Sequence, residues 1–247
     1  EARYLKLRLP VGLNRYIRKN VKLKYIDNII KAIFSIIKPF SEFQILKGYD
    51  AYRSFNKEVF SDFKKAIRSI IGEEIEEEIS KIEAKTNNKK QIKIVIVNRG
   101  KPPSFYKTKE SEIRATAAER RSIPNMSELV EAVGSIYDNV HTIHLEDKPL
   151  SYQFAYFSTA DVVIAQHGAA LANLIFSRND QLVIEIVDRR NLLNNAKESL
   201  FSELSKTLSL QHRIVVTNHG HEILDQNTME LIMQVIGEKV NSQQKRT

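Results

Sequence analysis

The clearest candidate for chemistry in this sequence is the run His167-Gly168-Ala169-Ala170, which directly follows an apolar segment. Such small residues leave room for a ligand beside backbone N–H groups, and a helix N-terminus at this point would favour negative charge. His167 could hydrogen-bond a phosphate oxygen or share proton chemistry at a leaving group. The run therefore predicts a phosphate or diphosphate site at Gly168 and Ala169, although a structural histidine and tight helix packing would use the same residues.

Further polar residues could hold the same ligand. Arg99 ends another apolar segment, and Arg120 and Arg121 follow it along the chain. A guanidinium offers a planar fork of N–H donors that grips phosphate bidentately, unless either paired arginine is simply solvated. Glu185 lies within an apolar run, where a buried carboxylate needs a partner, and a carboxylate suits the paired hydroxyls of a ribose. Together with the His167-Gly168 run, these arginine and glutamate side chains predict a nucleotide-diphosphate site.

Two asparagines are weaker candidates for the same site. Asn125 precedes Glu128 by three residues, which is equally the pattern of a capping box at a helix start. Asn173 could be a polar side chain on a short helix. From these patterns alone, the sequence indicates an α/β domain that binds a phosphate-containing ligand.

The elements that must position these groups alternate between strand and helix. We expect strands at residues 92–97, 140–145, 161–166, 182–187 and 213–217, and helices at 127–137, 150–158, 169–176, 195–208 and 227–240. This alternation implies right-handed crossovers and a doubly wound parallel sheet with helices on both faces. Ligands bind such sheets at the carboxyl ends of the strands. We therefore predict a Rossmann-like domain over residues 89–247 that binds a phosphate-containing ligand.

Residues 1–88 are interpreted as a mainly helical N-terminal region. Apolar residues recur at helical spacing within residues 26–37, which predicts one buried helix stripe. A second apolar stripe runs from Phe55 to Ile70, and we expect it to end at Gly72. An acidic run at 73–78 is typical of a solvated helix. The polar stretch that follows it places the expected boundary near residue 88.

The net charge of +8 comes entirely from residues 1–47, which hold eleven Lys and Arg against three Asp and Glu. Such a segment could be a solvated helix face, or could meet anionic lipid, a phosphorylated substrate or nucleic acid. No apolar run approaches the roughly 20 residues of a spanning helix. We expect a cytoplasmic protein with peripheral membrane contact through this basic segment.

The chain has no cysteine, which excludes disulfides, thiolate zinc sites and a cysteine nucleophile. It begins at Glu1 without a signal-peptide pattern, which is typical of a fragment or a processed form.

Four blocks of the sequence together resemble glycosyltransferase family 61. Residues 160–176 and then 183–186 are similar to the family's signature, in which a His-Gly-Ala turn is followed by Asn, Phe and Glu. Upstream, Val97-Asn98-Arg99 and residues 120–129 look like the family's Arg strand end and its Arg-x-Ile-x-Asn-x-x-Glu-Leu segment. The resemblance covers roughly residues 92–215.

This resemblance implies that residues 89–247 are the nucleotide-sugar-binding domain, the C-terminal half of a GT-B fold. It also implies an inverting, metal-independent transfer of a sugar from a UDP-sugar to a glycan or polysaccharide precursor. No Asp-x-Asp occurs in the sequence, which agrees with a site that needs no metal or other cofactor. The resemblance implies His167 as the catalytic residue. It implies these donor-binding residues: Arg99, Arg120, Arg121, Asn125, Gly168, Ala169, Asn173 and Glu185. Residues 1–88 are short for an acceptor domain and would be a remnant of one.

Two other classes of function compete with this interpretation. A non-catalytic nucleotide-sugar or phosphate-binding module would keep the fold and the site without turnover. A nucleic-acid-binding protein would use the basic segment, but that segment shows no recognisable nucleic-acid module and the rest of the chain is neutral. We therefore expect no nucleic-acid partner.

Overall fold

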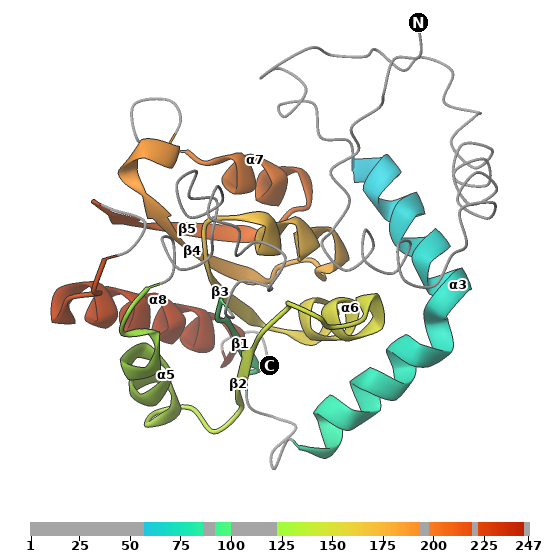
Figure 1. Cartoon of the computed structure of the whole chain (residues 1–247), viewed down its shortest axis with the longest axis horizontal. Coiled ribbons are helices and arrows are strands. Elements are labelled where there is room, and N and C mark those ends of the chain that lie inside the picture. Colours follow the sequence, from blue (N-terminus) through green and yellow to red (C-terminus); the bar gives the residue numbers. More distant parts are fainter. Residues whose placement is uncertain (1–56, 86–91, 100–122, 193–197, 219–221, 245–247) are drawn as a thin grey trace, which may run out of the picture.

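A computed structural model describes residues 57–85, 92–99, 123–192, 198–218 and 222–244 (Figure 1). The helical stripe expected at residues 26–37, and the candidate site residues Arg120 and Arg121, lie outside these ranges. Within the described ranges, no helix has the length and apolar character needed to cross a membrane.

A single five-stranded sheet forms the centre of the described structure, and all its strands are parallel. The strands are β1 (Ile94–Val97), β2 (Val140–Ile143), β3 (Val162–Gln166), β4 (Leu182–Asp188) and β5 (Gln211–Thr217), in the spatial order β2-β1-β3-β4-β5. Every residue of β1, β3 and β4 is buried, as β-branched strands covered on both faces should be. The predicted α/β class with a parallel sheet is confirmed.

Helices cover both faces of this sheet, as Figure 1 shows. They are α3 (Lys57–Ala84), α5 (Met126–Gly134), α6 (Leu150–Thr159), the 3₁₀ helices η4 (Ala169–Phe176) and η5 (Arg189–Asn191), α7 (Leu200–Thr207) and α8 (Gln226–Gln244). One hydrophobic cluster joins one face of the sheet to α3, α6, η4 and α7. A second cluster joins the other face to α5 and α8. The sheet is thus the middle layer of three.

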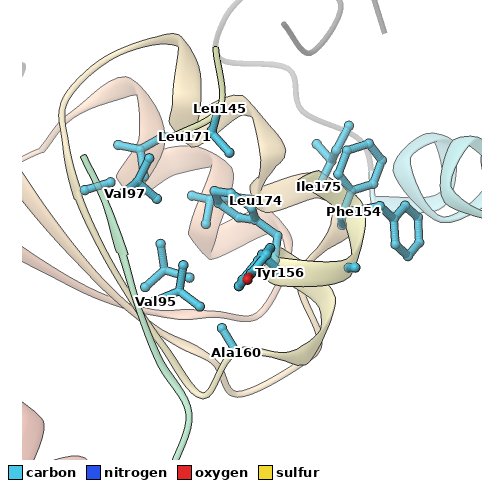
Figure 2. Close-up of a cluster of buried hydrophobic side chains, with 14 of the residues drawn as sticks. Val95, Val97, Leu145, Phe154, Tyr156, Ala160, Leu171, Leu174 and Ile175 are labelled. Carbon is cyan, nitrogen blue, oxygen red and sulfur yellow. The ribbon is translucent and has the colours of Figure 1, made fainter. Parts of the chain in front are cut away.

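Figure 2 shows the first cluster, in which Val95 and Val97 of β1 lie toward Leu174 of η4, and Phe154 of α6 lies farther from β1 in the same cluster. All four side chains are 3% exposed or less. Burying an aliphatic or aromatic side chain of this kind contributes about 1.5–3 kcal/mol. This packing fixes η4 against α6 and therefore fixes the turn that precedes η4.

Helix α3 corrects one expectation from the sequence. The helix does not stop at Gly72 but continues to Ala84, with a kink at Ile71 (φ −128°, ψ 32°). Ile75 and Ile82 continue its buried stripe past the kink, whereas Ile70, expected inside, is 61% exposed. Because α3 packs on α6 and shares the first core cluster, it is part of the same packed body as the sheet. The domain boundary at residue 88 stays a prediction.

The strand order places a topological switch between β1 and β3. From β1 the chain moves outward to β2, and it then returns to place β3 on the opposite side of β1. The connections that leave the carboxyl ends of β1 and β3 therefore run to opposite sides, and ligands of parallel α/β sheets bind at such a switch point. Arg99 follows β1 and His167 follows β3, so both lie at this switch point.

Candidate functional site

Arg99 and His167 are brought together by the register of β1 and β3. Val97 is paired with Ala165, so the residues two positions further along lie level with each other on neighbouring strands. Nη2 of Arg99 donates a hydrogen bond of 2.5 Å to the carbonyl oxygen of His167. The guanidinium is thereby anchored across the turn that links β3 to η4, as a phosphate-gripping group would need to be.

Gly168 is required by this approach of Arg99. Its φ of 154° lies in a region that L side chains rarely adopt. A Cβ placed on Gly168 would lie 2.3 Å from Nη2 of Arg99 and 3.3 Å from its Cζ. The group that lies close to Gly168 in the structure is the Arg99 guanidinium, and the predicted approach of a ligand to this backbone stays a prediction.

The turn opens directly into η4. The peptide N–H of His167 donates to the carbonyl of Ile186 at 2.7 Å, which holds the turn against β4. Ala169 is exposed at the first position of η4. The N–H groups at such a start have no partner within the helix, so they make this end of η4 electropositive.

Among the described residues, Glu185 and Phe201 contact the imidazole of His167. Its Nδ1 lies 2.5 Å from Oε1 of Glu185, and its ring packs edge-on against Phe201 of α7 at 5.2 Å between ring centroids. The side chain is 17% exposed. Because Nδ1 is engaged by the carboxylate, Nε2 is the ring nitrogen that can face a ligand.

Glu185 is the central group of a buried polar network. Its side chain has no exposed surface, and it accepts hydrogen bonds from Nδ1 of His167, from the hydroxyl of Ser199 and, at 2.9 Å, from Nε2 of His212. Burial is the largest influence on the pKa of Glu185 and raises it, but the three hydrogen bonds together outweigh burial and hold the pKa at about 2. Glu185 is therefore an ionised acceptor for all three donors.

Ser199 ties this network to the start of α7. Its hydroxyl oxygen accepts from the backbone N–H of Ser202 at 3.0 Å, and the Ser202 hydroxyl lies 2.9 Å from the backbone N–H of Ser199. This is a reciprocal capping box. Ser199 is thus bonded both to the start of α7 and to the Glu185 carboxylate, which it shares with the two histidines.

Asn125 is placed in a different contact from the predicted one. Its amide bonds both backbone groups of Leu224, at 2.9 and 3.0 Å, and donates to Glu128 at 2.9 Å. It makes no side-chain cap bond to α5, so the capping-box interpretation is wrong. The backbone at Asn125 (φ −104°, ψ 34°) is not in the extended conformation that capping uses, and the side chain is directed to the segment before α8 instead.

Asn173 lies between η4 and α6 with no exposed surface. Its Nδ2 donates to Oε1 of Gln153 and to the carbonyl of Ala170, both at 3.1 Å. The side chains of Asn125 and Asn173 therefore form hydrogen bonds within the protein. Their contact with a donor nucleotide stays a prediction. The same holds for a ribose contact of Glu185, whose two oxygens are bonded by protein groups.

Sequence reasoning missed Ser199, Ser205 and His212. The fifth strand was expected to begin at Arg213, whereas β5 begins at Gln211, so His212 belongs to the sheet. The pairing of His212 with Val183 depends on the register of β4 and β5, which no local pattern in the sequence indicates. No group of His, Asp and Glu in the described part of the chain has the arrangement of a metal site.

A family model for glycosyltransferase 61 matches residues 13–184. The chain belongs to glycosyltransferase family 61. The matched segment includes Arg99 and the His167-Gly168 turn, and it ends one residue before Glu185. Comparison with curated proteins returned no significant match. The residues that this glycosyltransferase brings to the switch point from β1 and β3 thus lie within the matched segment, and most of the network behind His167 lies beyond it.

Proposed function

We propose that this family 61 glycosyltransferase moves a sugar from a nucleotide-diphosphate donor, a UDP-sugar, to a hydroxyl of a glycan or polysaccharide precursor. The transfer inverts the anomeric centre and uses no metal. The observation that carries this proposal is the crossing of Arg99 over Gly168 beside His167, at the switch point of a parallel sheet. This is the place where α/β sheets bind nucleotides.

The diphosphate would lie against the turn at Gly168. The exposed start of η4 supplies backbone N–H groups and a positive helix end, and Arg99 supplies a fixed cation. The bond to the His167 carbonyl orients the Arg99 guanidinium at the turn, and the planar fork of a guanidinium suits phosphate oxygens. Charge that develops on the leaving diphosphate would be stabilised by groups already in place.

In the reaction, the acceptor hydroxyl oxygen forms a bond to the anomeric carbon from the face opposite the diphosphate, and the hydroxyl proton passes to a general base on the acceptor side. The bond between that carbon and the phosphate oxygen breaks, and both bonding electrons leave with the diphosphate. His167 acts at the leaving group: with Nδ1–H given to Glu185, Nε2 hydrogen-bonds a phosphate oxygen when the ring is protonated.

The absence of a metal in this scheme rests on the chemistry of the chain. No Asp-x-Asp occurs anywhere in the sequence to bridge a metal and a diphosphate. Arg99 and the start of η4 supply positive charge of the kind a divalent cation would otherwise bring.

Titration calorimetry of the full chain with UDP, GDP, CMP and ADP, each with and without EDTA, tests the donor site. We expect UDP to bind equally in EDTA, and Arg99→Ala and His167→Ala each to weaken binding by about tenfold or more, because each removes a charge-assisted contact. Arg213→Ala, an exposed arginine on β5, is the matched control and should bind as the wild type does. Binding that requires a divalent ion would contradict the metal-free proposal, and UDP binding without any turnover of UDP-sugars would favour a non-catalytic module.

The acceptor side of the proposal uses the basic segment. With a charge of +8 over residues 1–47, the chain would lie at the cytoplasmic surface of a membrane, where anionic lipid attracts clustered Lys and Arg. Precursors anchored to lipid would reach the proposed donor site from that membrane surface.

A further inference from the structure

The second histidine in the network, His212, has no place in the proposed donor contacts. It stands on the edge strand β5, and its side chain is only 6% exposed. Its Nε2 lies 2.9 Å from Oε2 of Glu185, and its Nδ1 lies 2.8 Å from the hydroxyl oxygen of Ser205 on α7. Both ring nitrogens of His212 are therefore engaged inside the protein.

The proton positions follow from the partners. An ionised carboxylate only accepts hydrogen bonds, so Nδ1 of His167 and Nε2 of His212 each carry the proton that points to Glu185. In the neutral His212 ring, Nδ1 then carries the lone pair and accepts from the Ser205 hydroxyl. One chain of donors thus runs from Ser205 through His212 to the carboxylate that faces His167.

We propose that His212 is a positioning residue for the sugar transfer: by donating to Oε2 of Glu185 it holds that carboxylate so that Oε1 takes Nδ1–H of His167 and Nε2 is presented to the donor diphosphate. This inference rests on the proposed transfer function. His212 itself touches neither the substrate nor His167 in this scheme, and it acts only through Glu185.

Two features favour positioning over simple packing. Glu185 comes from the middle of a buried strand and its two oxygens face opposite neighbours, His167 from β3 and His212 from β5. Rotation of the carboxylate would lose both bonds at once. The pKa of about 2 at Glu185 also requires its donors, because burial alone would favour the neutral acid, which could not orient two N–H groups.

The experiment compares His212→Phe, which removes the donor, with His212→Gln, whose amide N–H₂ can replace Nε2–H. His141→Gln is the matched control, since His141 lies on β2 at the opposite edge of the sheet and contacts Asn139. In the ¹⁵N-labelled full chain, NMR reports which ring nitrogen of His167 is protonated. UDP titration and rates of UDP-sugar turnover are measured on the same samples.

We expect His167 to show one tautomer, with the proton on Nδ1, in the wild type, in His212→Gln and in His141→Gln. In His212→Phe the two tautomers mix, and kcat falls by about tenfold or more, the scale of a lost orientation, while the affinity for UDP stays within about threefold. A merely structural role would not move the tautomer or be rescued by glutamine. His212→Phe that keeps the single tautomer and the wild-type kcat would overturn the proposal, as would a His212→Gln as slow as the phenylalanine variant.

If His212→Phe does not fold, His212→Asn decides the question, because the shorter amide can keep the contact with Ser205 but lacks a donor at the position of Nε2. A mixed His167 tautomer in His212→Asn supports the proposal, and an unchanged tautomer with unchanged kcat overturns it. The NMR reading needs no substrate. A wild-type chain that neither binds UDP nor turns over UDP-sugars would therefore refute the transfer function, while the His167 resonances would still show whether His212 positions that ring.

Discussion

The Arg99 guanidinium lies across Gly168 and donates to the carbonyl of His167, although the two residues are 68 positions apart in the chain. The contact exists because β1 and β3 are neighbours in register. It places a cation, a helix start and an imidazole at one edge of the sheet. The proposed donor site of this family 61 chain depends on that juxtaposition.

Gly168→Ala should displace Arg99 and weaken UDP binding. The new methyl group would lie 2.3 Å from Nη2, and the φ of 154° is strained for alanine. We expect about tenfold weaker UDP binding and a loss of about 1–3 kcal/mol in the free energy of unfolding. Gly134→Ala, where a Cβ meets no atom within 4 Å, is the control and should bind UDP normally. Calorimetry and thermal unfolding measure both effects.

The Glu185 network should make folding sensitive to acid. The pKa of Glu185 is lowered from 4.5 to about 2 in the folded chain. Its contribution is therefore fully present above about pH 4.5 and is lost as the pH falls toward 2, a change of about 3 kcal/mol. Glu185→Gln cannot titrate and should lose that part of the pH dependence. Denaturant unfolding between pH 2 and 6, with Glu203→Gln on α7 as control, tests this, and equal slopes for wild type and Glu185→Gln would contradict it.

Asn125→Ala should destabilise the chain. The substitution removes two buried bonds to the backbone of Leu224, which tie the residues before α5 to those before α8. We expect a loss of about 2 kcal/mol in the free energy of unfolding, since two buried backbone groups lose their partner. Asn218→Ala, at an exposed position, should change it by less than about 0.5 kcal/mol. Similar unfolding curves for the two variants would refute this structural role of Asn125.

The basic segment should bind anionic membranes in a salt-dependent way. Residues 1–47 carry a charge of +8, and each Lys or Arg near such a surface contributes about 1 kcal/mol. We expect the chain to sediment with vesicles that contain phosphatidylserine and to be released at high salt, and not to sediment with neutral vesicles. Replacing Lys19, Lys22 and Lys24 by glutamine should weaken sedimentation. Equal binding to neutral vesicles would contradict an electrostatic contact.

The order of strands and helices could be predicted because each carries a local signal. The apolar run that becomes β3 and the small residues that open η4 are legible in sequence, and a parallel sheet places Arg99 and His167 at one edge. The resemblance to family 61 was confirmed by the family match.

The partners behind this site have no such local signal. Glu185 and His212 are 27 positions apart, and their contact depends on the register of β4 and β5. Asn125 and Leu224 are 99 positions apart, so their contact cannot be read from neighbouring residues. The local sequence around Asn125 indicated only a helix cap. The continuation of α3 beyond Gly72 likewise depends on burial against α6, because packing stabilises helices more than local propensity does.

The most direct test of the central claim is the release of UDP from UDP-sugars in EDTA, compared for the full chain and for His167→Ala. The account predicts turnover of at least one UDP-sugar without metal, and a rate at least about tenfold lower in the variant, because His167 acts at the leaving diphosphate. His141→Gln should react at the wild-type rate. Turnover that is unchanged by His167→Ala, or that disappears in EDTA, would contradict the account.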